Sequence, residues 1–128
     1  MKRILTAIAL ALMLTACQEP YEKAIDEYYQ EHLNDPSSYE CIKISKLQEV
    51  TPTTMFVWSH EDDPELDVKL SKFVDDFRRD GRDPQEHWGW YVTHEYRAAN
   101  SFGGKRVCKD RVVFDDKGEN IVRVERVK

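Results

Sequence analysis

The sequence predicts a single α+β domain in which one antiparallel sheet of four to five strands carries two amphipathic helices packed on one face. Two segments, 21–33 and 66–77, repeat apolar residues at steps of three and four, which is the spacing of a helix with one buried stripe. From residue 88 onward, apolar and polar residues alternate, which is typical of strands. The last strands follow one another through short turns, so they are expected to form a three-stranded meander.

The first helix is expected over 21–33, because Asp35 before Pro36 disfavours further helical backbone and Asn34 suits a C-terminal cap. The second helix is expected to start at Asp63-Pro64, where a capping oxygen precedes a proline that needs no N–H partner. It is expected to stop before Gly81. Its apolar stripe consists of Leu66, Leu70, Phe73, Val74 and Phe77.

Five segments are expected to form strands. Residues 38–50 alternate around Ile42 and Ile44 and are rich in β-branched residues. Pro52 interrupts this strand, and 54–59 is expected to form a short second one. The three strands of the meander are expected at 88–99, 105–115 and 121–127, with a turn over 100–105 and a second turn in which Gly118 adopts the left-handed conformation.

Residues 1–16 have the features of a cleaved signal peptide. Lys2 and Arg3 precede an apolar run over 4–14, which is shorter than the roughly 20 residues that a membrane-spanning helix needs. The sequence Leu-Thr-Ala-Cys at 14–17 resembles the lipobox of bacterial lipoproteins. The resemblance implies that Cys17 is acylated and becomes the mature N-terminus, with 17–20 as a short tether to a domain over 21–128. Two or three acyl chains hold a protein firmly to a bilayer.

The resemblance also implies a location. An aspartate after the acylated cysteine retains enteric lipoproteins in the inner membrane, whereas this chain has Gln18, so an outer-membrane protein facing the periplasm is expected. Loss of the leader, with its two positive charges, takes the formal net charge from −5 to −7. This charge argues against nucleic-acid binding. The expected partners are the membrane, through Cys17, and another envelope protein; no cofactor or metal is expected.

Cys41 and Cys108 are the thiols that remain after acylation of Cys17, and the export signal places them in an oxidising compartment. A disulfide between them is therefore predicted, with two buried free thiols as the alternative. Closing such a loop stabilises a fold by about 4 kcal/mol in the chain-entropy view. Because Cys41 has the opposite parity to Ile42 and Ile44, the bond requires a bulge, an edge position or a strand end.

Two motifs, LNDPSSYE at 33–40 and YRAANSFGGK at 96–105, resemble paired motifs of a widespread group of small exported bacterial proteins. That group has no assigned activity, so the resemblance carries over no catalytic residue. One interpretation makes both motifs hinges of the fold, with polar side chains and glycines fixing the turns. The other makes the second motif the edge of a binding groove formed by Arg97, Asn100, Phe102, Gly103, Gly104 and Tyr91.

Three classes of function remain open from the sequence. The leading hypothesis is a lipid-anchored, non-enzymatic binding domain, because no sequence motif pairs a nucleophile with a base. The second is a small periplasmic hydrolase or metal-dependent enzyme that uses His60, His87 or His94. The third is an immunity or inhibitor lipoprotein. Two of these histidines meeting a carboxylate in a deep pocket would favour the enzyme, and scattered histidines would favour the binding domain.

Overall fold

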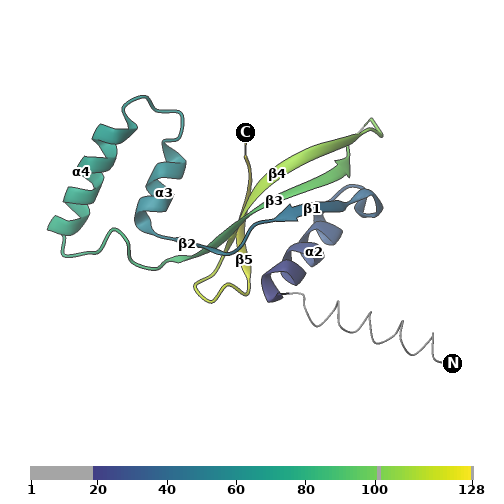
Figure 1. Ribbon diagram of the computed structural model, residues 1–128, viewed down its shortest axis with the longest axis horizontal. Helices are drawn as coiled ribbons and strands as arrows, with labels where there is room; N and C mark the ends of the chain where they lie inside the picture. The colour runs from purple at the N-terminus through teal and green to yellow at the C-terminus, as the bar shows by residue number, and fades with distance from the viewer. Residues whose placement is uncertain (1–18, 101, 128) are drawn as a thin grey trace.

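A computed structural model describes residues 19–100 and 102–127 and confirms the α+β class with one antiparallel sheet (Figure 1). The signal peptide and the acylation site Cys17 lie outside the described residues. The elements, in chain order, are α2 (Pro20–His32), the 3₁₀ helix η1 (Pro36–Ser38), β1 (Glu40–Ile44), β2 (Gln48–Val50), α3 (Pro52–Ser59), α4 (Leu66–Arg79), β3 (Gly89–Ala99), β4 (Lys105–Phe114) and β5 (Ile121–Arg126).

Strand β3 is the organising strand of the sheet. The strand order is β1-β3-β4-β5, and β2 pairs with β3 beyond the end of β1. The predicted meander of β3, β4 and β5 is confirmed, and Gly118 in its second turn has the predicted positive φ of 73°. In the register of the sheet, Tyr96 lies opposite both Cys41 and Cys108, and His94 lies opposite Asp110.

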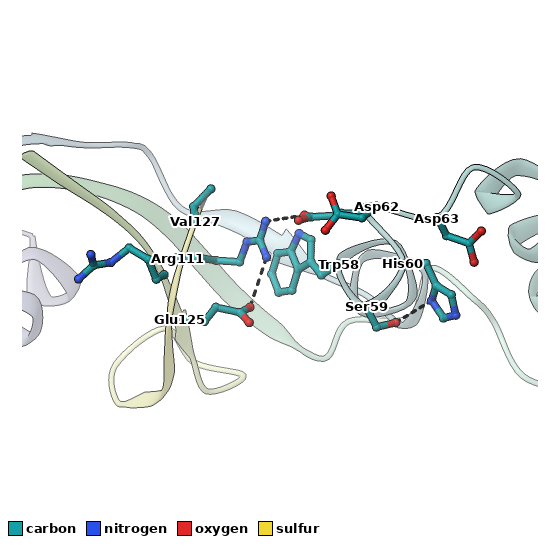
Figure 2. A pocket seen from close by; sticks show the side chains of 10 residues that line it. Trp58, Ser59, His60, Asp62, Asp63, Arg111, Glu125 and Val127 are labelled. Carbon is teal, nitrogen blue, oxygen red and sulfur yellow. Dashed lines mark hydrogen bonds and ion pairs between the residues drawn. The ribbon is translucent and has the colours of Figure 1, made fainter.

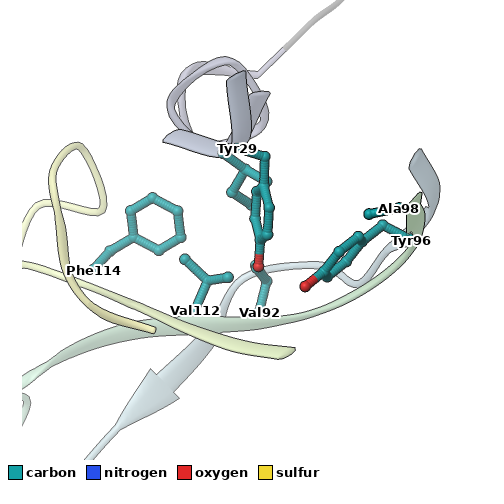
Figure 3. Packing of buried hydrophobic residues seen from close by; sticks show 7 residues of the cluster. Tyr29, Val92, Tyr96, Ala98, Val112 and Phe114 are labelled. Carbon is teal, nitrogen blue, oxygen red and sulfur yellow. The ribbon is translucent and has the colours of Figure 1, made fainter. Parts of the chain in front are cut away.

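The core lies between α2 and one face of the sheet (Figure 3). Because side chains alternate along a strand, the even-numbered residues of β3 and β4 point toward α2. Tyr29 reaches down from the helix between Phe114 and Tyr96. Complete burial of a large apolar side chain contributes about 1.5–3 kcal/mol, so this cluster supplies much of the stability. Its buried members are Ile25, Tyr29, Val92, Tyr96, Ala98, Val112 and Phe114.

The prediction of a strand at 54–59 is wrong, because these residues belong to helix α3. Thr51 and Thr54 form a reciprocal capping box, in which each side chain accepts a hydrogen bond from the other residue's backbone N–H. Pro52 follows at the first helical position, where its fixed φ suits a helix. A short apolar run has no periodicity that distinguishes a strand from a helix. The N-terminal cap is therefore the local feature that favours a helix here.

The single strand predicted over 38–50 is divided into η1, β1 and β2. The break between η1 and β1 has a structural role, because Ser38 Oγ donates to Asp35 O (2.7 Å) and accepts from Ala99 N (2.9 Å). The first motif therefore joins the end of α2 to the end of β3. A bulge lies between Cys41 and Lys43, so Cys41 and Ile44 both face α2 although one position is odd and the other even. The bulge that the sequence analysis required on grounds of parity is therefore present.

The structure refines the placement of the second helix. Phe56 of α3 stacks on Phe73 of α4 with their ring centroids 4.5 Å apart, and the α3–α4 pair lies beyond the β2 end of the sheet (Figure 1). The ring of Trp58 meets Tyr91 edge-on at 4.7 Å, on the sheet face opposite α2. Helix α4 starts at Leu66 rather than Pro64, because Asp63 Oδ1 caps Glu65 N in a turn before the helix.

Candidate functional site

The second motif forms the turn between β3 and β4. Asn100 Oδ1 accepts the backbone N–H groups of Phe102 (3.0 Å) and Gly104 (3.1 Å), and Asn100 N donates to Gly104 O at 2.7 Å. Gly103 has φ +84°, a conformation that a residue with a Cβ adopts only at a cost. The backbone of the turn is therefore fixed by one side chain and one glycine.

This turn presents an aromatic side chain to solvent. The side chain of Phe102 is 95% exposed, and Lys105 and Arg106 next to it are also exposed. Arg97 is exposed on the sheet face opposite α2, where it pairs with Val107, which is 60% exposed. Aromatic and arginine side chains carry much of the binding energy in protein interfaces. We refer to Arg97, Asn100, Phe102, Gly103 and Gly104 as the hairpin tip.

Tyr91, the sixth residue of the predicted groove, lies elsewhere. It is six positions before Arg97 on the same strand, and at about 3.3 Å per residue the two are separated by about 20 Å. Its ring contacts Trp58 instead. The structure thus brings five of the predicted residues together and places the sixth at the opposite end of β3.

A cleft with a volume of about 530 Å³ lies between β4, β5 and the loop after α3 (Figure 2). Arg111 lies at its centre, with its side chain only 13% exposed. Its guanidinium forms ion pairs with Glu61 (2.8 Å) and Glu125 (3.3 Å) and stacks over Trp58 at 4.1 Å. Sequence reasoning missed this cleft, because Trp58 was expected in a strand.

The cleft is charged mainly by carboxylates, since Glu61, Glu125, Asp62 and Asp63 line it together with two arginines, Arg111 and Arg126. Because Glu61 and Glu125 both engage Arg111, this cation is already neutralised by protein groups. These contacts therefore fix the end of α3 to the sheet face opposite α2. The remaining carboxylates of the cleft favour ligands that donate hydrogen bonds.

The three histidines proposed for catalysis do not meet in the structure. His60 stacks on Phe56, and its Nδ1 bonds with Ser59 Oγ (2.8 Å). Figure 2 shows His60 on the side of the loop away from Arg111. His87 Nε2 donates to the backbone of Asp116 at 2.9 Å, which raises its pKa. His94 is completely buried under α2.

The predicted Cys41–Cys108 disulfide is not formed, and both thiols are free. Cys41 on β1 and Cys108 on β4 lie opposite the same residue, Tyr96 on β3, so a whole strand separates them. Two strand spacings amount to about 9–10 Å, whereas the Cα atoms of a disulfide are no more than about 7 Å apart. Burial raises the pKa of the Cys41 thiol.

A buried polar network, also missed from the sequence, connects α2 to the sheet. Asp110, 4% exposed, accepts hydrogen bonds from Tyr29 Oη (2.6 Å), Tyr96 Oη (2.9 Å) and Arg126 Nε (2.7 Å). Arg126 also donates to Tyr96 Oη at 3.2 Å. The available signal was a carboxylate at a position of β4 that shares its parity with Val112, where an apolar residue is the norm.

This environment perturbs the ionisable side chains around Asp110. Burial raises the pKa of Tyr29, and the hydrogen bond to Asp110 raises it further. Burial lowers the pKa of His94, whose Nε2 is 2.8 Å from the hydroxyl of Tyr39 and whose Nδ1 has no hydrogen-bond partner in the described part of the chain. The network is thus built to hold neutral phenols and a neutral imidazole around one paired carboxylate.

Comparison with known proteins identifies the membrane attachment. Residues 1–18 match a prokaryotic membrane lipoprotein lipid attachment site. The chain is therefore a lipid-anchored cell-envelope protein, attached through Cys17. No curated protein and no solved structure matches it. Over residues 19–100 and 102–127, no helix has the length and apolar character to cross a membrane, and no three metal-ligating side chains cluster.

Proposed function

We propose that this protein is a non-enzymatic interaction domain that faces the periplasm from the outer membrane and binds another envelope component through the hairpin tip. The observation that carries the proposal is the 95% exposure of Phe102 on a turn that Asn100 fixes. An apolar ring on a rigid turn loses little conformational entropy when a partner covers it. The glycines beside it let a partner approach the backbone closely.

The position of the tip relative to the anchor supports this role. Two residues lie between Cys17 and Pro20, the start of α2, and the three Cα–Cα steps between them reach about 10 Å at full extension. The 13 residues of α2 then span about 20 Å, and Ser38 joins the far end of this helix to Ala99, at the base of the tip. The start of α2, to which the tether leads, and the tip thus lie at opposite ends of the helix, so a partner at the tip is expected to leave the anchor in place.

The dispersal of His60, His87 and His94 supports binding over the hydrolase alternative, because each imidazole is engaged by a different part of the fold. An inhibitor of an exported enzyme would be one form of such an interaction domain. The identity of the captured partner distinguishes that form from a structural contact.

The test is affinity capture from envelope extract with the full lipidated protein and its Phe102→Ser variant. Val122→Ser serves as the matched control, because Val122 is also exposed (63%) but lies on β5. We expect a partner that the unmodified and Val122→Ser proteins retain and that Phe102→Ser loses. Arg97→Ala is expected to weaken the same capture. Equal recovery of the same proteins with all four chains would refute the proposal.

A further inference from the structure

We propose that the cavity between the C-terminal end of α2 and the base of the β3–β4 hairpin binds a small carboxylic acid with a short aliphatic body. This cavity has a volume of about 200 Å³. It is smaller than the pockets that hold drug-sized ligands, which are about 300–1,000 Å³. The residues that carry the argument are Leu33, Ala98, Asn100, Arg106, Cys108 and Arg126.

The lining residues come together because of the sheet register. Ala98 lies opposite Arg106, and Tyr96 lies opposite Cys108, so all four point to the α2 face. Leu33, at the C-cap of α2, lines the cavity on its helix side with an apolar side chain. The lining therefore has an aliphatic part, made by Leu33 and Ala98, and a polar part that includes Asn100, Arg106 and Arg126; we call these the aliphatic wall and the polar wall.

The polar wall offers hydrogen-bond donors. Asn100 uses its Oδ1 for two backbone N–H groups of the turn, which fixes the amide orientation and leaves the Nδ2 donor for the cavity. Arg126 uses Nε for Asp110 and one terminal nitrogen for Tyr96, so its second terminal nitrogen is available. Arg106 has no side-chain partner among the residues that the structure describes.

The acceptors next to the cavity are already occupied. Tyr96 Oη donates to Asp110 and accepts from Arg126, and Asp110 accepts three hydrogen bonds. The charge of Arg126 is balanced by Asp110, whereas no carboxylate of the described part of the chain pairs with Arg106. A ligand with acceptor atoms only and one negative charge fits these groups, and a carboxylate paired with a guanidinium has that chemistry.

The aliphatic wall selects between anions. Leu33 and Ala98 offer no hydrogen bonds, so a phosphate, which is polar on every side, would leave oxygens without partners there. A short-chain acid places its methyl and methylene groups against this wall. We therefore assign the site to a carboxylate such as propionate or butyrate rather than to a phosphate.

Cys108 and Cys41 make the site measurable in the lipidated protein in detergent. Cys108 lines the cavity, and Cys41 lies outside it on the other side of Tyr96, so the second thiol is an internal control. After reduction, the rate at which iodoacetamide alkylates each thiol is followed by mass spectrometry, in sodium butyrate, sodium phosphate or sodium chloride at equal pH and ionic strength. Butyrate is expected to slow alkylation of Cys108 several-fold and to leave Cys41 unchanged.

Variants separate binding from general effects of salt. Arg106→Gln is expected to abolish the protection of Cys108, whereas Arg97→Gln, an exposed arginine on the opposite face of the same hairpin, is expected to retain it. Equal slowing of both thiols, protection that survives Arg106→Gln, or stronger protection by phosphate than by butyrate would overturn the proposal. The shift in unfolding temperature caused by butyrate, compared between the same variants, gives a second readout that does not depend on thiol reactivity.

Discussion

The hydroxyl of Tyr29, on α2, donates a 2.6 Å hydrogen bond to Oδ2 of Asp110, on β4, across 81 positions of sequence. This bond fixes the helix to the sheet at the centre of the core. It also satisfies part of the hydrogen-bonding capacity of a carboxylate that would be costly to bury alone.

Tyr29→Phe is expected to lower the free energy of unfolding by about 1.5–3 kcal/mol, because a hydrogen bond to a charged acceptor is lost. Tyr28→Phe is the matched control: Tyr28 is half-buried, and its hydroxyl has no hydrogen bond to a described residue. Its effect should stay within about 0.5 kcal/mol. Urea unfolding followed by circular dichroism measures both, and equal losses would show that the Tyr29–Asp110 bond contributes little.

His94 is expected to make the fold less stable in mild acid. Burial lowers its pKa, although the backbone of Lys43 and the carboxylates of Asp110 and Asp26 oppose the shift. The unfolded chain therefore takes up a proton near pH 6.5 while the folded chain resists it, so the free energy of unfolding falls as the pH drops below about 6.5. The decline ends once folded His94 itself becomes protonated.

The measurement is urea unfolding between pH 7.5 and 5.5 with and without His94→Gln, in a His87→Gln background. The background is needed because the hydrogen bond to the backbone of Asp116 raises the pKa of His87. The folded chain then binds a proton at His87 more readily than the unfolded chain, so this residue increases the free energy of unfolding as the pH falls, opposite to the effect of His94. The pH dependence over this interval should shrink in His94→Gln. An unchanged slope would contradict the assignment to His94.

Arg111→Met is expected to lower the free energy of unfolding by about 1–3 kcal/mol, because it removes two ion pairs and a cation–π contact from a side chain that is only 13% exposed. Arg111→Lys should recover only part of this loss, since an ammonium cannot pair with two carboxylates and stack on Trp58 at once. Arg123→Met, which removes an exposed partner of Glu125, should change stability by less than about 1 kcal/mol. Fluorescence-detected unfolding tests all three, and an Arg123 effect as large as that of Arg111 would argue against the central role of the cleft.

Gly103→Ala is expected to lower the free energy of unfolding by about 1 kcal/mol, because alanine adopts a φ of +84° only with strain. Gly104→Ala should have a smaller effect, since an added Cβ would meet only the Asn100 side chain, at 3.7 Å. Thermal unfolding of the two variants is the measurement. Identical stability of both would mean that the turn relaxes to another conformation.

The sequence determined the elements whose signals are local. The stripe at 21–33 predicted α2 to within a residue at each end, and the alternation from residue 88 predicted β3, β4 and β5 and their meander. Gly118 and the Asp35-Pro36 break were predicted for the same reason, since a backbone angle or a missing N–H acts within a few residues. The anchor at Cys17 was predicted because a peptidase and an acyltransferase recognise a short linear sequence.

Pairings between distant residues could not be predicted in this way. The sequence contains Asp110, Tyr29 and Arg126, but only the packing of α2 on β3, β4 and β5 brings the three together. The same holds for Arg111 with Trp58, which required α3 to be a helix, and for the cysteines, whose separation is set by the strand between them. The spacing of residues along the chain therefore determined most helices and strands of this protein and its anchor. The partners of the buried carboxylate, the clefts and the separation of the two free thiols depended on strand order and register, which no short segment encodes.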